Sequence, residues 1–181
     1  MNTQSPIPET RRYVAVNPDD KSLSIEREAT PVPAANEVLI KVHAAGLNRA
    51  DLLQRQGLYP PPEDASPILG LEVAGEVLTT GADVSGWQPG DSICALTHGG
   101  GYADCTVAPV SQCLPIPDDY TMAQAAALPA VAIVLATIVA KKAADASLQA
   151  MCDLWGESLF AEEMQELDGS ILSLAEGQEP D

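Results

Sequence analysis

The chain has 181 residues, 46% of them hydrophobic and 4% aromatic, and its 9 basic and 26 acidic residues give a formal net charge of −17. This length is enough for one domain with a hydrophobic core and an extension. The acidic balance argues against binding to nucleic acid or to an anionic membrane surface, because both need clustered lysine and arginine.

The cysteines and the N-terminus indicate where in the cell the protein is located. Cys94, Cys105, Cys113 and Cys152 show no paired short spacing, so we expect buried free thiols rather than a zinc site or a disulfide framework. No apolar run opens the chain, so no signal peptide is expected. These features predict a cytoplasmic protein.

Short β-prone segments separated by turns fill the first two thirds of the chain. Residues 1–12 are polar and are predicted to be a flexible lead-in. Alternation of apolar and polar residues predicts strands at 13–16, 23–25, 37–45, 73–77 and 93–96. His43 lies in one of them, and we expect a partly exposed strand residue rather than a metal ligand.

The segment after these strands contains the strongest turn signals. Three consecutive glycines within His98–Val107 predict a β-hairpin, and no phosphate-binding loop is expected because no helix pattern follows them. Residues 113–117 are expected to be extended, with Asp118 or Asp119 capping a helix that begins near Met122. The whole pattern predicts a mainly β fold, an antiparallel barrel or sandwich with few helices.

Residues 46–75 contain the candidate functional residues. Asn48 and Asp51 are three apart, so a helical turn puts them on one face. Tyr59 precedes three prolines, which restrict its backbone. Gly70 and Gly75 mark places where the backbone passes close to other atoms. The residues alone also fit an ordinary surface loop.

The segments 48–59 (NRADLLQRQGLY) and 68–75 (ILGLEVAG) resemble the zinc-independent quinone oxidoreductases of the medium-chain dehydrogenase/reductase superfamily, especially the NADPH:quinone reductase subgroup. The resemblance runs from about residue 13 to residue 129. It implies a GroES-like antiparallel β-barrel at 13–129 that transfers a hydride from NADPH to a quinone or an enone.

The resemblance also implies roles for individual residues. In the family, the positions of Asn48 and Tyr59 lie beside the nicotinamide, so both are expected to be catalytic. Asn48 and Asp51 are expected to orient the cofactor, and the tyrosine hydroxyl suits donation to the oxyanion that forms on the quinone.

Zinc is not expected as a cofactor. Zinc-dependent relatives have a cysteine at the position of Asn48 and a histidine at that of Leu71. An amide and a leucine do not supply the thiolate or imidazole that a catalytic zinc needs.

Residues 130–181 do not resemble the family, whose Rossmann domain with a glycine-rich turn is expected to be absent here. Residues 130–140 are apolar but too short to span a bilayer, so they predict a buried or oligomer-forming helix. Ten acidic and two basic residues at 131–181 leave a net charge of −8. Within 146–176, apolar residues recur at helical spacing among acids, which fits an acidic amphipathic helix. The alternative is a rearranged, unpacked end. The prediction is a helical acidic extension.

Three functions remain open at this stage. The chain is expected to be a quinone reductase domain, weak or inactive alone because the second half of its cofactor cleft is missing. Alternatively, it is a non-catalytic fragment that forms homo-oligomers or pairs with a full-length relative, or a truncation product without function.

Overall fold

The computed structural model describes residues 5–60, 65–130 and 132. The chain divides into two units, Met1–Pro129 and Ala130–Asp181, and the fold below is that of the first. The predicted helical extension lies almost entirely outside the described residues. Among the helices of the described residues, none has the length and apolar character needed to cross a membrane.

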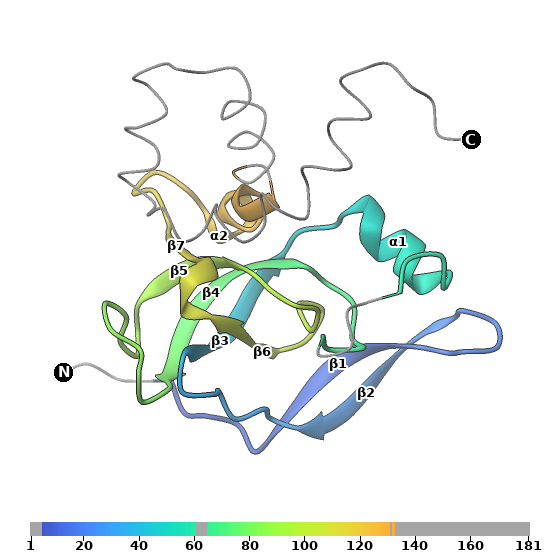
Figure 1. The fold of residues 1–181 in the computed structure, drawn as a ribbon, viewed down its shortest axis with the longest axis horizontal. Helices are drawn as coiled ribbons and strands as arrows, with labels where there is room; N and C mark the ends of the chain where they lie inside the picture. The colour runs from blue at the N-terminus through green and yellow to red at the C-terminus, as the bar shows by residue number, and fades with distance from the viewer. Residues whose placement is uncertain (1–4, 61–64, 131, 133–181) are drawn as a thin grey trace. The chain divides into compact units, whose positions relative to one another are not determined.

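Strands dominate the described residues (Figure 1). They are β1 (Thr10–Val16), β2 (Leu23–Ala29), β3 (Glu37–Ala45), β4 (Glu72–Thr80), β5 (Ser92–Leu96), β6 (Cys105–Pro109) and β7 (Cys113–Pro115). The helices are α1 (Arg49–Arg55), the 3-10 turn η1 (Val110–Gln112) and α2 (Met122–Ala125). The prediction of a mainly β fold with few helices is confirmed.

The main sheet has five antiparallel strands in the order β6-β3-β4-β5-β7. Its two edge strands, β6 and β7, follow one another in the chain and are joined by only the three residues of η1. A connection this short brings the two edges together, so the sheet must curve into a partial barrel (Figure 1).

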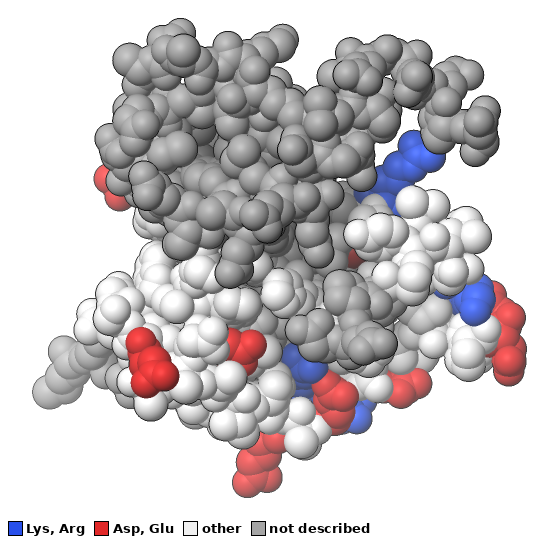
Figure 2. Space-filling view, in the orientation of Figure 1, with Lys and Arg blue, Asp and Glu red and all other residues white. Residues whose placement is uncertain are grey.

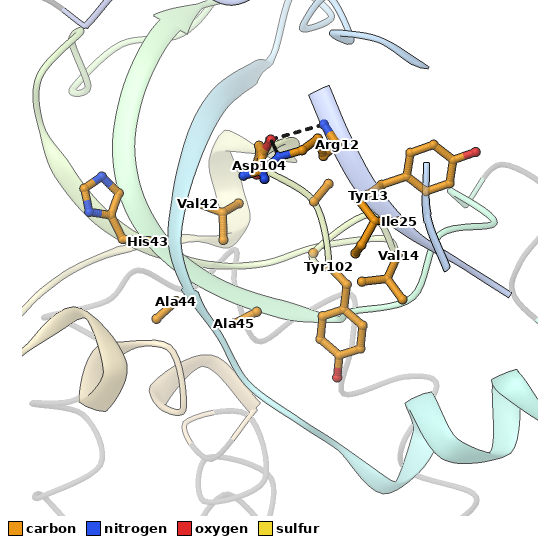
Figure 3. Close-up of a pocket in the computed structure, with 12 residues that line it drawn as sticks. Arg12, Tyr13, Val14, Ile25, Val42, His43, Ala44, Ala45, Tyr102 and Asp104 are labelled. Atoms are coloured by element: carbon orange, nitrogen blue, oxygen red, sulfur yellow. Dashed lines mark hydrogen bonds and ion pairs between the residues drawn. The ribbon is translucent and has the colours of Figure 1, made fainter. Parts of the chain in front are cut away.

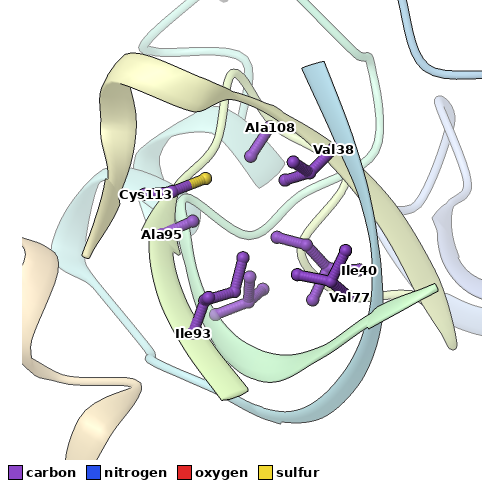
Figure 4. Close-up of a cluster of buried hydrophobic side chains, with 8 residues drawn as sticks. Val38, Ile40, Val77, Ile93, Ala95, Ala108 and Cys113 are labelled. Atoms are coloured by element: carbon purple, nitrogen blue, oxygen red, sulfur yellow. The ribbon is translucent and has the colours of Figure 1, made fainter. Parts of the chain in front are cut away.

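The concave side of this sheet holds the hydrophobic core. Figure 4 shows side chains from all five strands pointing into the same interior. The buried set is Val38, Ile40, Val73, Val77, Ile93, Ala95, Ala108 and Cys113. Burial of small and β-branched residues explains how a chain with few aromatic residues forms a core.

A separate two-stranded ribbon, β1 paired with β2, attaches to the sheet through residues 102–105. The backbone N–H of Val14 donates to the carbonyl oxygen of Tyr102 at 2.9 Å, and that of Asp104 donates to Arg12 at 2.9 Å. The Arg12 guanidinium pairs with the Asp104 carboxylate at 2.9 Å. The turn of the ribbon has a second attachment, because Nε of Arg55 in α1 donates to the carbonyl oxygen of Lys21 at 2.8 Å.

Two local predictions are wrong. Residues 98–107 do not form a hairpin, because β5 pairs with β4 and β7 whereas β6 pairs with β3. The glycines form a loop that crosses between non-adjacent strands. Asp118 and Asp119 do not cap α2, whose N-cap is Thr121, with its side-chain oxygen accepting from the N–H of Gln124 at 3.3 Å.

The three described cysteines, Cys94, Cys105 and Cys113, are free and buried, as predicted. Burial raises the pKa of the Cys94 thiol to about 11 and that of Cys113 to about 12. Both thiols therefore stay protonated near neutral pH.

Charged side chains on one face of the described residues lie in small groups of either sign (Figure 2). Because acidic and basic groups are interspersed there, this face does not carry one extended basic patch of the kind that binds a polyanion.

Candidate functional site

The candidate site begins at the N-terminus of α1, where Asn48 is the N-cap residue. Its backbone N–H donates to Oδ2 of Asp51 at 2.8 Å, which is the reach-back contact of a capping box. The spacing of three therefore does bring Asn48 and Asp51 together. The helix start and the candidate site are built from the same two residues.

Asp51 is a buried carboxylate, only 1% exposed. Besides the N–H of Asn48, it accepts from the N–H of Gly70 at 3.1 Å and from the hydroxyl of Tyr102 at 2.8 Å. Three donors from three separate parts of the chain satisfy the group, as a buried carboxylate requires. Asp51 thus ties α1 to the loop before β4 and to the loop before β6.

Tyr102 closes this group from the other side. Its hydroxyl also lies 3.1 Å from the carbonyl oxygen of Gly46, so its one proton has two acceptors within reach. Burial first, and then the hydrogen bond to Asp51, raises the pKa of Tyr102 well above its usual range. The phenol is therefore held as a neutral donor.

Glu72, the first residue of β4, is a second buried carboxylate, 4% exposed. Its Oε1 accepts a hydrogen bond from Nδ2 of Asn48 at 2.9 Å. The half-buried Asn48 therefore joins the two acids: its backbone bonds to Asp51 and its side chain to Glu72.

Gly70 shows why the turn between the two segments needs a glycine. Its φ is +100°, and an added Cβ would meet the backbone nitrogen of Tyr102 at 2.5 Å. The N–H of Gly101 and the hydroxyl of Thr97 both donate to its carbonyl oxygen, at 2.9 and 3.0 Å. The predicted close approach of backbone is confirmed at Gly70, and also at Gly75, where a Cβ would overlap the carbonyl oxygen of Lys41.

Tyr59 lies at the opposite end of α1 from Asn48. The helix ends in a Schellman motif: Gly57 has φ +77°, and the N–H of Leu58 donates to Leu53 at 2.9 Å. Tyr59 follows directly and is 51% exposed. Its phenol takes no part in the group formed by Asn48, Asp51, Glu72 and Tyr102, and residues 61–64 beyond it lie outside the described residues.

Sequence reasoning missed two members of this group. In the sequence, Glu72 appears only as one residue of the segment 68–75, and Tyr102 only as the residue that follows three glycines. The partner of Asn48 is 24 residues away and that of Asp51 is 51 residues away, so no local spacing could have identified them. The signal available was chemical: an acid in an apolar strand entry needs a donor.

A hollow of about 370 Å³ lies beside this group, between the ribbon and β3. Figure 3 shows the Tyr102 ring at its wall, with the hydroxyl directed away from the Arg12–Asp104 pair, and His43 across β3 from Tyr13 and Val14. His43 is exposed, in line with the expectation for a strand residue. Within the ranges that the structure describes, no three histidine, cysteine or acidic side chains are grouped to hold a metal ion.

Comparison with known proteins identifies the part of the chain that carries this site. Residues 34–118 match the family described as the alcohol dehydrogenase GroES-like domain. A mouse synaptic vesicle membrane protein VAT-1 homolog-like is 36% identical over 107 residues, or 59% of this chain and 26% of that protein. A mouse quinone oxidoreductase is 37% identical over 99 residues, or 54% of this chain and 30% of that protein.

A solved structure has the same fold. The human VAT-1 homolog-like protein superposes with a TM-score of 0.62 at 34% identity, covering 71% of this chain and 42% of that one. The chain thus spans less than a third of the length of the two curated relatives.

Proposed function

Because residues 34–118 form an alcohol dehydrogenase GroES-like domain, related to the quinone oxidoreductases of the medium-chain dehydrogenase/reductase superfamily, we propose that this chain supplies the substrate half of an NADPH:quinone oxidoreductase. The reaction is transfer of a hydride to a quinone or an enone. The observation that carries the proposal is Asn48, held half-buried between two buried carboxylates.

The surroundings of Asn48 and Tyr59 fit a nicotinamide and a quinone. Leu47 and Leu58, next to them in the chain, are 76% and 69% exposed, and exposed apolar side chains can cover the faces of flat rings. Asn48 supplies a polar group for orienting the cofactor, and Asp51 orients Asn48. When bound, the cofactor supplies the hydride.

Tyr59 is proposed to donate its hydroxyl proton in a hydrogen bond to the oxygen on which charge develops. Its 51% exposure leaves the phenol accessible to a substrate. Supporting this role, no side chain among the described residues competes for the hydroxyl.

We further propose that the reaction is zinc-free. At the position where zinc-dependent relatives have a cysteine, this chain directs an amide N–H toward Glu72. An N–H group that donates to a carboxylate is not a metal ligand, and the half-buried Leu71 has no ligand atom in its side chain.

The proposal is tested by NADPH binding, followed by fluorescence, and by turnover with 1,2-naphthoquinone. For the chain alone, weak saturable binding and slow turnover are expected. Tyr59→Phe should lower kcat about 100-fold, roughly the effect of removing an oxyanion donor. Tyr120→Phe, which changes an exposed tyrosine outside the site, should leave kcat unchanged. Absence of saturable NADPH binding would remove the enzyme proposal.

A second candidate function is docking to a nucleotide-binding domain of a full-length relative. Exposed apolar residues around α1, namely Leu47, Leu52, Leu58 and Tyr59, favour a covered surface there. The chain should then co-elute with a full-length relative in size-exclusion chromatography, and Leu58→Asp should abolish co-elution while leaving the thermal melt unchanged. Separate elution of the wild-type chain would exclude this function, and a shift of the chain alone would indicate a homo-oligomer.

We propose that the protein is located in the cytoplasm, and its three buried free thiols support this location. Fractionation of cells that express the tagged chain checks this, and recovery in the membrane fraction would contradict it.

A further inference from the structure

The orientation of the Asn48 side-chain amide is determined by its neighbours. One branch of the amide, Nδ2, lies 2.9 Å from Oε1 of Glu72. A carboxylate only accepts hydrogen bonds, whereas an amide has one donor and one acceptor branch. The nitrogen branch must therefore face Glu72, and the carbonyl oxygen Oδ1 occupies the other branch.

Glu72 cannot easily turn away from this contact. It is 4% exposed, and its backbone is fixed by the β4–β5 pairing with Leu96 and by the N–H of Gly46, which donates to its carbonyl oxygen at 3.0 Å. An added Cβ at Gly46 would overlap Oε1 of Glu72. The carboxylate therefore lies directly over a residue that has no side chain.

The backbone of Asn48 is equally restrained. Its N–H donates to Asp51 at 2.8 Å, and Asp51 is held in turn by the N–H of Gly70 and the hydroxyl of Tyr102. With both the backbone and one branch of the amide fixed, only a 180° exchange of nitrogen and oxygen would change what Asn48 presents. That exchange would bring Oδ1 against the carboxylate, which is repulsive.

We propose that Glu72 is a positioning residue that locks the Asn48 amide, so that Asn48 presents its carbonyl oxygen to a ligand. A ligand group that binds Oδ1 of Asn48 must then be a hydrogen-bond donor, such as a hydroxyl or a primary carboxamide. The naming of the ligand rests on the proposed function, whereas the lock itself does not.

This orientation distinguishes the ligands of the proposed reaction by whether they can donate a hydrogen bond. A quinone carries only acceptors, while reduced nicotinamide cofactors carry a carboxamide and ribose hydroxyls, and the diol product carries hydroxyls. Oδ1 of Asn48 therefore holds the cofactor or the product rather than a carbonyl oxygen of the quinone. Specificity at such a site is strong, because a wrong partner leaves polar groups unpaired.

The lock is tested by NMR of the asparagine side-chain amides in the full chain, with the Asn48 signals assigned by their loss in Asn48→Ser. In the wild type, one Asn48 amide proton should exchange with water about tenfold more slowly than those of the exposed Asn36. Glu72→Met should abolish this difference. Glu72→Gln should restore it, since glutamine retains an acceptor, and Glu76→Met on the same strand should leave it unchanged.

Exchange at Asn48 as fast as at Asn36 in the wild type would overturn the lock, whether or not the protein binds NADPH. An unchanged rate in a folded Glu72→Met variant would do the same. Cooperative thermal melts of all variants show that each is folded.

The donor assignment is tested by adding NADPH, 1,2-naphthalenediol or 1,2-naphthoquinone at millimolar concentration. NADPH or the diol should shift the Asn48 amide signals, and the quinone should not. A shift with the quinone alone, or no shift with any of the three, would overturn the donor assignment. NADPH binding by fluorescence without a shift at Asn48 would overturn it too, while leaving the proposed function standing.

Discussion

Two regions of the molecule, α1 and the ribbon, both contact residues 102–105, and two of these contacts differ in burial. On one side, Tyr102 bonds to the buried Asp51 and so fixes α1. On the other side, Asp104 pairs with Arg12 of the ribbon, with side chains 43% and 57% exposed. Both contacts are hydrogen bonds to carboxylates at about the same distance.

The difference between them is burial. Water competes for the Arg12–Asp104 pair and salt screens it, so such contacts contribute little stability. Inside the protein, losing one partner of Asp51 leaves a buried donor or acceptor unpaired, which is costly. The Tyr102–Asp51 contact should therefore contribute more stability than the Arg12–Asp104 pair. The ribbon also has a buried contact with this stretch, because Nη1 of Arg11 donates to the carbonyl oxygen of Cys105 at 2.6 Å.

The strongest test of this comparison is to delete the buried carboxylate. Asp51→Ala removes the acceptor of three donors and should lower the free energy of unfolding by about 3 kcal/mol. Urea unfolding monitored by tryptophan fluorescence measures it, with the exposed Asp83→Ala as the control. Asp51→Asn keeps one acceptor, so its loss of unfolding free energy should lie between those of Asp51→Ala and Asp83→Ala. Equal losses for Asp51→Ala and Asp83→Ala would refute the buried anchor.

A smaller loss is expected from Gly46→Ala. The new methyl group would overlap Oε1 of Glu72, and forcing the two apart should cost about 1–3 kcal/mol. In a Glu72→Ala background the methyl group has space, so the cost should largely disappear. A double-mutant cycle in urea measures this coupling, and additive effects would show that the two residues do not press on each other.

Removal of one hydroxyl compares the two regions directly. Tyr102→Phe should lower the free energy of unfolding by about 1–2 kcal/mol. Tyr13→Phe removes a surface contact with Glu26 at 3.1 Å, so it should lower the free energy of unfolding by less. Because the pKa of Tyr102 is raised in the fold, its contribution is complete below the ordinary tyrosine range and is lost as the pH rises through the raised value. Thermal melts in alkali should therefore show the wild type approaching Tyr102→Phe.

The smallest effect is expected at the ribbon. Arg12 lowers the pKa of Asp104, so the stabilisation from this pair is present above the ordinary aspartate range and is lost as the pH falls through the lowered value. Asp104→Asn should destabilise slightly near neutral pH and not at all in strong acid or high salt. A loss that persists in high salt would mean that the ribbon anchor is not electrostatic.

Much of the fold was predictable because local patterns encode it. The alternation in 37–45 predicted β3 to its ends, and the spacing of Asn48 and Asp51 predicted their contact. The errors arose where distant strands decide the outcome. The glycines at 99–101 look like a hairpin turn, but β6 finds its partner in β3, more than sixty residues earlier.

The candidate site shows the same division. Residues 48 and 51 were recognisable from helix geometry, whereas Glu72 and Tyr102 join them only through the tertiary structure. The role of Tyr59 remains a prediction, since its exposed phenol makes no contact with the group around Asp51.

The three-residue link between β6 and β7 has a consequence for how the protein is made. A ribosome releases the N-terminal strands first, yet both margins of the main sheet come from residues 105–115, near the end of the domain. The apolar inner surfaces of β3, β4 and β5 therefore stay exposed to solvent until those last residues have been synthesised. We expect nascent chains that stop before Cys105 to be degraded by proteases much faster than chains that extend past Pro115.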